Sequence, residues 1–111
     1  MTDLSEGNKA PDFSAQADGD KEISLEDYKG KKLILYFYPK DDTPGCTKEA
    51  CAFRDNLTAL QGLNCAVIGV SKDSVKSHDK FKDKYDLNFP LLADEDTKIC
   101  QDYGVWKEDF F

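Results

Sequence analysis

Four cysteines are the residues in this sequence best suited to chemistry, because a thiolate is a strong nucleophile and a good metal ligand. They are Cys46, Cys51, Cys65 and Cys100. Cys46 lies three residues after Thr43, whose hydroxyl can donate a hydrogen bond to a small polar substrate or accept one from it. Pro39 and Pro44 stiffen the loop and screen the sulfur from water. Cys46 is the candidate nucleophile, with the alternative that it is only an apolar position on a helix.

The segments on either side of Cys46 predict a strand followed by a helix. Residues 33–38 form a continuous apolar run, which is typical of a central strand buried on both faces. Thr43 can cap a helix with Pro44 at its first position, and Gly62 can end it. Cys46 then lies in the first turn, where unpaired N–H groups and the helix dipole favour a thiolate.

Six further segments have the pattern of strands or helices. Strands are expected over residues 10–17, 22–25, 65–70 and 89–93, and helices over residues 75–85 and 96–103. The alternation of strands and helices predicts the α/β class with a largely parallel sheet. In such sheets ligands collect at the carboxyl ends of the strands, which is where Cys46 falls.

Length and charge restrict the class of protein. The 111 residues carry 15 basic and 22 acidic side chains, for a formal net charge of −7, and 40% are hydrophobic. This composition fits one small domain with a single core, and the acidic excess argues against nucleic-acid binding. No apolar run approaches the about 18 residues of a membrane span, and residues 1–9 lack an apolar signal core. We therefore expect a soluble, cytoplasmic protein that contacts no membrane.

Metal binding is not expected. A Cys-x4-Cys spacing without a second close pair does not fit the usual arrangement of zinc ligands. The only histidine, His78, has charged neighbours on both sides and is expected to be solvated on a polar helix face. Cys65 begins an apolar run and is expected to be structural. We predict neither a metal nor a cofactor.

The residues around Cys46 resemble those of the peroxiredoxins. The segment PKDDTPGC at residues 39–46 matches the P-x-x-x-T-x-x-C signature of that family. The longer stretch LYFYPKDDTPGCTKEAC at residues 35–51 is similar to the bacterioferritin comigratory protein or peroxiredoxin Q subfamily. The resemblance implies a thioredoxin-like fold, in a single AhpC/TSA-type domain over residues 1–111.

The resemblance also implies the reduction of hydrogen peroxide and organic hydroperoxides. Cys46 would be the peroxidatic cysteine, which attacks the peroxide and becomes a sulfenic acid. Thr43 would align the peroxide with the sulfur, and Pro39 would shield the thiolate. The other residues assigned to substrate binding are Gly45, Glu49 and Arg54.

The resemblance implies that a second cysteine resolves the sulfenic acid. Cys51 is the candidate because its spacing of five residues from Cys46 matches many subfamily members, with Cys100 as a more distal alternative. A helix rises about 7.5 Å over five residues, whereas a disulfide joins Cα atoms up to roughly 6.8 Å apart. The helix must therefore unwind, with Pro44 and Gly45 as the hinge. The resemblance implies a thioredoxin or similar dithiol as reductant and a monomer, with a dimer as the alternative.

Two features depart from the family pattern. The family continues for several tens of residues with two strands, a helix and an arginine that contacts the peroxidatic sulfur, so we expect a chain that is incomplete at its C-terminus. Arg54 is the only arginine and lies about 12 Å along the helix from Cys46. The alternative function is therefore a non-catalytic thioredoxin-like redox-sensing or binding module. The absence of Cys-x-x-Cys disfavours a general disulfide oxidoreductase.

Overall fold

The computed structural model describes residues 6–105. Its strands are β1 (Ser14–Ala17), β2 (Lys21–Ser24), β3 (Lys32–Phe37), β4 (Cys65–Ser71) and β5 (Leu91–Ala93). Its α-helices are α1 (Pro44–Gly62), α2 (Val75–Tyr85) and α3 (Lys98–Asp102). Short 3-10 helices follow β1 at Asp18–Asp20 and β2 at Leu25–Tyr28. None of the described helices is long and apolar enough to cross a membrane.

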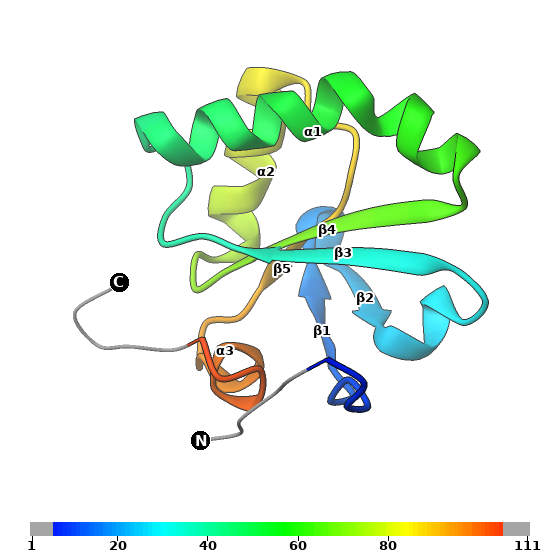
Figure 1. Cartoon of the computed structure of the whole chain (residues 1–111). Helices are drawn as coiled ribbons and strands as arrows, with labels where there is room; N and C mark the ends of the chain where they lie inside the picture. Colours follow the sequence, from blue (N-terminus) through cyan, green and yellow to red (C-terminus); the bar gives the residue numbers. More distant parts are fainter. Residues whose placement is uncertain (1–5, 106–111) are drawn as a thin grey trace.

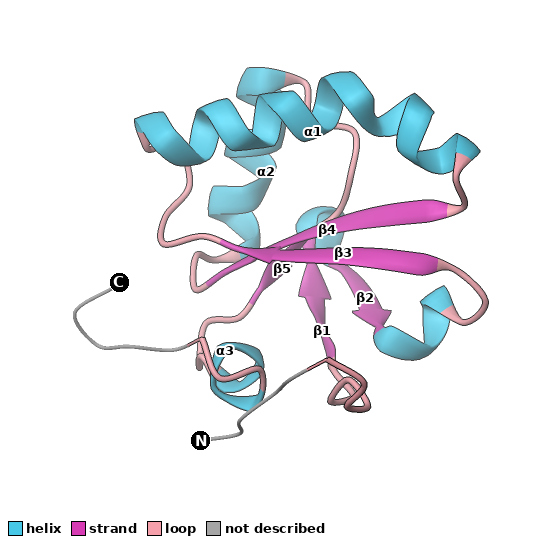
Figure 2. Ribbon diagram, viewed as in Figure 1, coloured by secondary structure: helices cyan, strands magenta, loops and turns pink. Residues whose placement is uncertain are grey.

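The five strands form one mixed sheet in the order β2-β1-β5-β4-β3 (Figure 2). β3, β4 and β5 run parallel, and α1 and α2 connect them, as the strand–helix alternation predicts. β1 pairs antiparallel with both β2 and β5. The predicted N-terminal hairpin is therefore confirmed, and it is the part of the sheet that is not parallel.

β3 is an edge strand of the described sheet, rather than the central strand that its apolar run predicts. Side chains on both of its faces do pack: Tyr36 lies in the core beneath α1, and Leu35 packs on the opposite side. The prediction was wrong because an apolar run reports that both faces of a strand are covered, and says nothing of its hydrogen-bonded edges.

Two helices cover one face of the sheet, and α3 lies against the other (Figure 1). The buried core beneath α1 and α2 consists of Tyr36, Tyr38, Ala50, Leu57, Val67, Phe81, Leu87, Phe89 and Leu91. The core on the α3 side consists of Phe13, Ala17, Ile68, Val70, Leu92, Ile99 and Cys100. Successive residues of β4 and β5 alternate between the two cores because side chains along a strand point to opposite faces.

Candidate active site

The loop that leaves β3 and enters α1 holds the candidate nucleophile at the carboxyl ends of the parallel strands. Tyr38 extends the pairing of β3 by donating its backbone N–H to the Val70 carbonyl at 3.0 Å. Thr43 is the N-cap residue of α1 and Pro44 occupies the first turn, as predicted. The Thr43 hydroxyl does not cap the helix; it donates to the Lys40 carbonyl at 3.0 Å and closes the loop on itself.

Cys46 lies in the first turn of α1, is half-buried, and packs against the core beneath the helix. Tyr36 belongs to that core, and its hydroxyl has no hydrogen-bond partner among the described residues. Burial raises the pKa of Tyr36 above its ordinary value, and negative charge at Glu49 and at Cys46 adds to the shift. The core against which Cys46 packs therefore contains an unpartnered hydroxyl.

Asp41 ties the loop to the rest of the molecule. Its buried carboxylate accepts hydrogen bonds from the Tyr38 hydroxyl at 2.6 Å and the Ser77 hydroxyl at 2.8 Å. The same carboxylate lies 2.8 Å from Nδ1 of His78. The backbone N–H of Asp41 donates to Asp73, which follows β4, at 2.8 Å. One residue of the loop is thus fixed by contacts to α2 and to the end of the neighbouring strand.

Asp42 adds a second attachment to α2. Its backbone is left-handed, with φ of 62°, and its carboxylate accepts hydrogen bonds from Lys84 and from the Tyr85 hydroxyl, each at 2.7 Å. The hydrogen bonds from Lys84 and Tyr85 lower the pKa of Asp42. Adjacent aspartates therefore fasten the loop to both ends of α2.

The structure corrects the expectation for His78, which is fully buried instead of solvated. Its charged sequence neighbours occupy other faces of α2, whereas His78 shares the inward face with Phe81, one turn later. The spacing of His78, Phe81 and Tyr85 along one helical face was a signal for burial. Sequence reasoning missed His78, Asp41 and Tyr38 as residues of this site.

The other predicted site residues are spread along the loop and α1. Pro39 is half-buried next to Tyr38, and Gly45 and Glu49 are exposed on the first turns of α1. Arg54 does not reach the loop in this structure, since it pairs with Asp55 at 2.9 Å and donates to the Tyr85 carbonyl at 2.5 Å. Its contacts are therefore with a neighbouring residue of α1 and with the C-terminal end of α2.

The four thiols are free and lie in different environments. Cys51 is half-buried within the intact helix α1, five residues after Cys46. Cys65 begins β4, at the end of the strand away from the loop. Cys100 is fully buried in α3, and burial and the neighbouring Asp94 raise the pKa of its thiol. The sheet separates Cys100 from Cys46, because the two residues pack in different cores.

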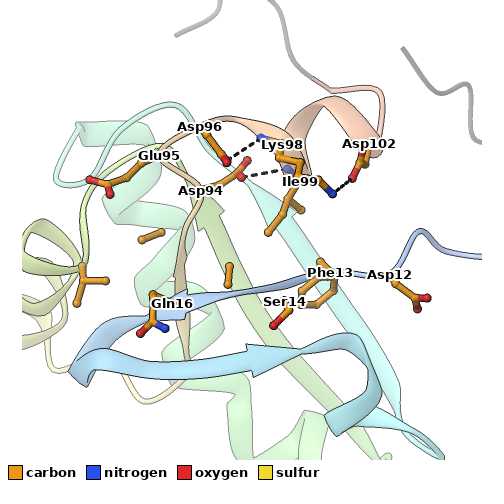
Figure 3. Close-up of a pocket in the computed structure, with 13 residues that line it drawn as sticks. Asp12, Phe13, Ser14, Gln16, Asp94, Glu95, Asp96, Lys98, Ile99 and Asp102 are labelled. Carbon is orange, nitrogen blue, oxygen red and sulfur yellow. Dashed lines mark hydrogen bonds and ion pairs between the residues drawn. The ribbon is translucent and has the colours of Figure 1, made fainter.

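An acidic pocket between β1 and α3 is separate from this site (Figure 3). The Asp94 carboxylate accepts from the backbone N–H groups of Ile99 and Cys100, at 3.0 and 2.9 Å. Lys98 pairs with Asp102 at 3.2 Å. Asp94 therefore fixes the start of α3, and the Lys98–Asp102 pair lies within that helix. Among residues 6–105 no group of three or more His, Cys, Asp or Glu side chains could hold a metal ion.

Comparisons with known proteins agree with this geometry. Residues 7–110 match the AhpC/TSA family. The chain is 59% identical over 99 residues to a putative peroxiredoxin bcp of Coxiella burnetii, covering 89% of this chain and 66% of that protein. It is 45% identical over 111 residues to a putative peroxiredoxin bcp of Haemophilus influenzae, covering 100% of this chain and 72% of that protein.

A solved structure extends the similarity to three dimensions. The bacterioferritin comigratory protein of Xanthomonas campestris, studied for its alkyl peroxide reduction activity, superposes with a TM-score of 0.83. It is 39% identical, and the match covers 86% of this chain and 60% of that chain. This chain thus spans about two thirds of the length of such relatives.

Fold and site together define a thioredoxin-like α/β protein that carries a cysteine in the first turn of the helix after β3. Within that class the chain belongs to the AhpC/TSA family, and its relatives there are peroxiredoxins of the Bcp and Q type. The resemblance inferred from residues 35–51 is confirmed.

Proposed function

We propose that this chain is a thiol-dependent peroxidase that reduces hydrogen peroxide and organic hydroperoxides with Cys46 as the nucleophile. The observation that carries the proposal is the place of Cys46 in the first turn of α1, behind a loop with the family signature. Main-chain N–H groups at a helix start stabilise negative charge on sulfur and on the attacked oxygen.

The first step is a displacement at the O–O bond. The Cys46 thiolate attacks the terminal oxygen, an S–O bond forms, and the O–O bond breaks. The departing alkoxide or hydroxide takes up a proton and leaves as alcohol or water. Cys46 becomes a sulfenic acid, oxidised by two electrons, while the peroxide is reduced by two.

The loop and first turn of α1 supply the substrate contacts in this proposal. The Thr43 hydroxyl donates to the Lys40 carbonyl, so its oxygen can still accept a hydrogen bond from a hydroperoxide. Pro39 shields the sulfur, Gly45 leaves the helix start open, and Glu49 adds a carboxylate one turn further on. Arg54 would need to leave its contacts with α2 to reach the same place.

Resolution uses Cys51. Its thiolate attacks the Cys46 sulfur, water leaves, and an intramolecular disulfide forms. Both residues are helical in this structure, so the first turns of α1 must unwind before the sulfurs can meet. A dithiol such as thioredoxin then reduces the disulfide. We propose that the protein works as a monomer in the cytoplasm.

Peroxide consumption coupled to thioredoxin, thioredoxin reductase and NADPH tests the function. The wild-type chain should turn over hydrogen peroxide, and Cys46→Ser should abolish turnover. Cys65→Ser is the matched control and should keep nearly full activity, because Cys65 lies at the far end of β4. Oxidation of Cys46 to a stable sulfenic acid or disulfide without turnover would instead favour the redox-sensing module.

A further inference from the structure

His78 is held on both sides by hydrogen-bond acceptors. Its Nε2 lies 2.8 Å from the Leu92 carbonyl, and its Nδ1 lies 2.8 Å from the Asp41 carboxylate. A carbonyl oxygen can only accept, so Nε2 carries a hydrogen. The ring bridges β5 and the loop that precedes α1, and it is fully buried.

The second nitrogen also faces an acceptor. Hydroxyl groups of Tyr38 and Ser77 both donate to the Asp41 carboxylate, so its two oxygens already act as acceptors. Because Nε2 and Nδ1 each lie 2.8 Å from an accepting oxygen, both ring nitrogens donate. His78 and Asp41 thus form a buried imidazolium–carboxylate pair.

Other charges near the ring support this protonation state. Burial alone would lower the pKa of His78, but the hydrogen bond and charge of Asp41, together with other nearby groups, raise it above its ordinary value. The Leu92 carbonyl and the Asp73 charge act in the same direction. Asp79 and Lys82 on α2 are engaged elsewhere, with the Gly19 N–H and with Asp18.

The pair has a direct mechanical link to Cys46. Asp41 is the buried residue of the loop from 39 to 43, and that loop leads into the first turn of α1. We propose that His78 is a positioning residue for Cys46: as an imidazolium between Asp41 and the Leu92 carbonyl, it fixes the loop that aims the sulfur at the peroxide. The inference rests on the proposed role of Cys46 as nucleophile.

Nitrogen-detected NMR of the imidazole tests the charge state. The chain has a single histidine, so one set of ring signals reports on this site alone. We expect both ring nitrogens to be protonated at pH 6.5, and the titration midpoint to lie above the ordinary value for histidine. A neutral ring with one protonated nitrogen at pH 6.5 would overturn the proposal.

Rate measurements on the full chain test the positioning role. We compare oxidation of Cys46 by hydrogen peroxide with its alkylation by iodoacetamide, in wild type and in His78→Gln. Peroxide attack needs an aligned loop, whereas alkylation needs only an accessible thiolate. Because small misalignments cost large factors in rate, His78→Gln should slow peroxide oxidation by about 10- to 100-fold and alkylation far less. The faster peroxide oxidation of wild type relative to His78→Gln should disappear as pH rises through the titration midpoint of the imidazole.

Two further variants keep the test decisive. Asp79 is next to His78 in sequence, but its carboxylate binds the hairpin turn and not the loop. Asp79→Ala should therefore leave the oxidation of Cys46 by peroxide unchanged. Ser77→Ala removes one donor to Asp41 without leaving a large cavity, and it should also slow the oxidation of Cys46 by peroxide. This variant still tests the proposal if His78→Gln folds poorly. Equal peroxide rates in wild type, His78→Gln and Ser77→Ala would overturn the positioning role alone. A wild-type Cys46 that reacts with peroxide no faster than Cys65 would overturn both this inference and the proposed function.

Discussion

At the scale of single residues, two neighbouring core tyrosines differ in one hydrogen bond. Tyr36 and Tyr38 stack with ring centroids 5.5 Å apart in the core beneath α1. The Tyr38 hydroxyl donates to Asp41, whereas the Tyr36 hydroxyl is buried without a partner among residues 6–105. Because an unsatisfied buried hydroxyl costs about 1–3 kcal/mol, Tyr36→Phe should raise the free energy of unfolding by about 1 kcal/mol.

Tyr38→Phe is the matched control for that change. It keeps the ring and removes a hydrogen bond to a buried carboxylate, so it should lower the free energy of unfolding by about 1–3 kcal/mol. Urea unfolding of the two variants and wild type measures both effects. A loss of stability in Tyr36→Phe would mean that its hydroxyl has a partner after all.

The four thiols should react at different rates with an alkylating reagent. Cys46 is half-buried at the start of α1 and, as the proposed nucleophile, it should be labelled first. Cys100 should be labelled last, because it is fully buried and its pKa is raised. Brief iodoacetamide treatment and peptide mapping give the order. Labelling of Cys51 or Cys65 as fast as Cys46 would contradict the assignment of the nucleophile.

Local pattern was enough to find Cys46 but not the residues that hold its loop. A helix cap, a proline and a cysteine within four positions define the first turn without reference to the rest of the chain. Asp41 and His78 meet only because α2 packs across the loop, and they are 37 residues apart in sequence. No local signal links them, and the charged neighbours of His78 suggested a solvated histidine.

At the scale of elements, the main consequence concerns α1. One equivalent of hydrogen peroxide should join Cys46 to Cys51 and reduce the helical circular dichroism signal, because this disulfide cannot span intact helical turns. Cys51→Ser should keep its helical signal after the same treatment and become sensitive to overoxidation at Cys46. Mass spectrometry identifies the linkage. A Cys46–Cys100 bond would contradict the choice of Cys51 and would require α3 to leave its side of the sheet.

Helices were predicted more closely than strand order, for a physical reason. α1 and α2 have the predicted bounds because their caps and apolar faces are local features. Strand order depends on contacts between distant segments, so the edge position of β3 did not follow from its composition. α3 begins at Lys98 and not at residue 96, because Thr97 takes a left-handed backbone with φ of 59° and Asp94 supplies the cap.

At the scale of the whole molecule, α2 connects parts that are distant in sequence. Lys82 on α2 pairs with Asp18 in the hairpin turn at 2.6 Å, and Asp18 also accepts from the Leu91 N–H at 2.9 Å. His78 on the same helix joins the loop before α1 to β5. The charge state of one buried side chain can therefore affect the stability of the entire fold.

Stability should accordingly depend on pH through His78. The pKa of His78 is raised in the folded state, so the folded protein holds this proton more tightly than the unfolded chain does. The stabilisation is fully present below about pH 6.5, the unfolded value, and is lost as pH rises through the folded pKa. The difference in free energy of unfolding between wild type and His78→Gln should thus be largest at acidic pH and smallest at alkaline pH. A folded pKa that exceeds the unfolded one by one pH unit corresponds to about 1.4 kcal/mol of this difference.

Urea unfolding of both proteins at pH 5.5, 7.0 and 8.5 measures this difference. Comparison within the pair cancels the titration of the acidic groups that do not contact His78, and no other histidine is present to contribute. Asp79→Ala lacks an exposed carboxylate and keeps His78. Its difference in free energy of unfolding from His78→Gln should therefore decline with pH as the wild-type difference does. If the wild-type advantage grows as pH rises, His78 is neutral in the folded protein, and the carboxylate of Asp41 is held by Tyr38 and Ser77 without a buried counter-charge.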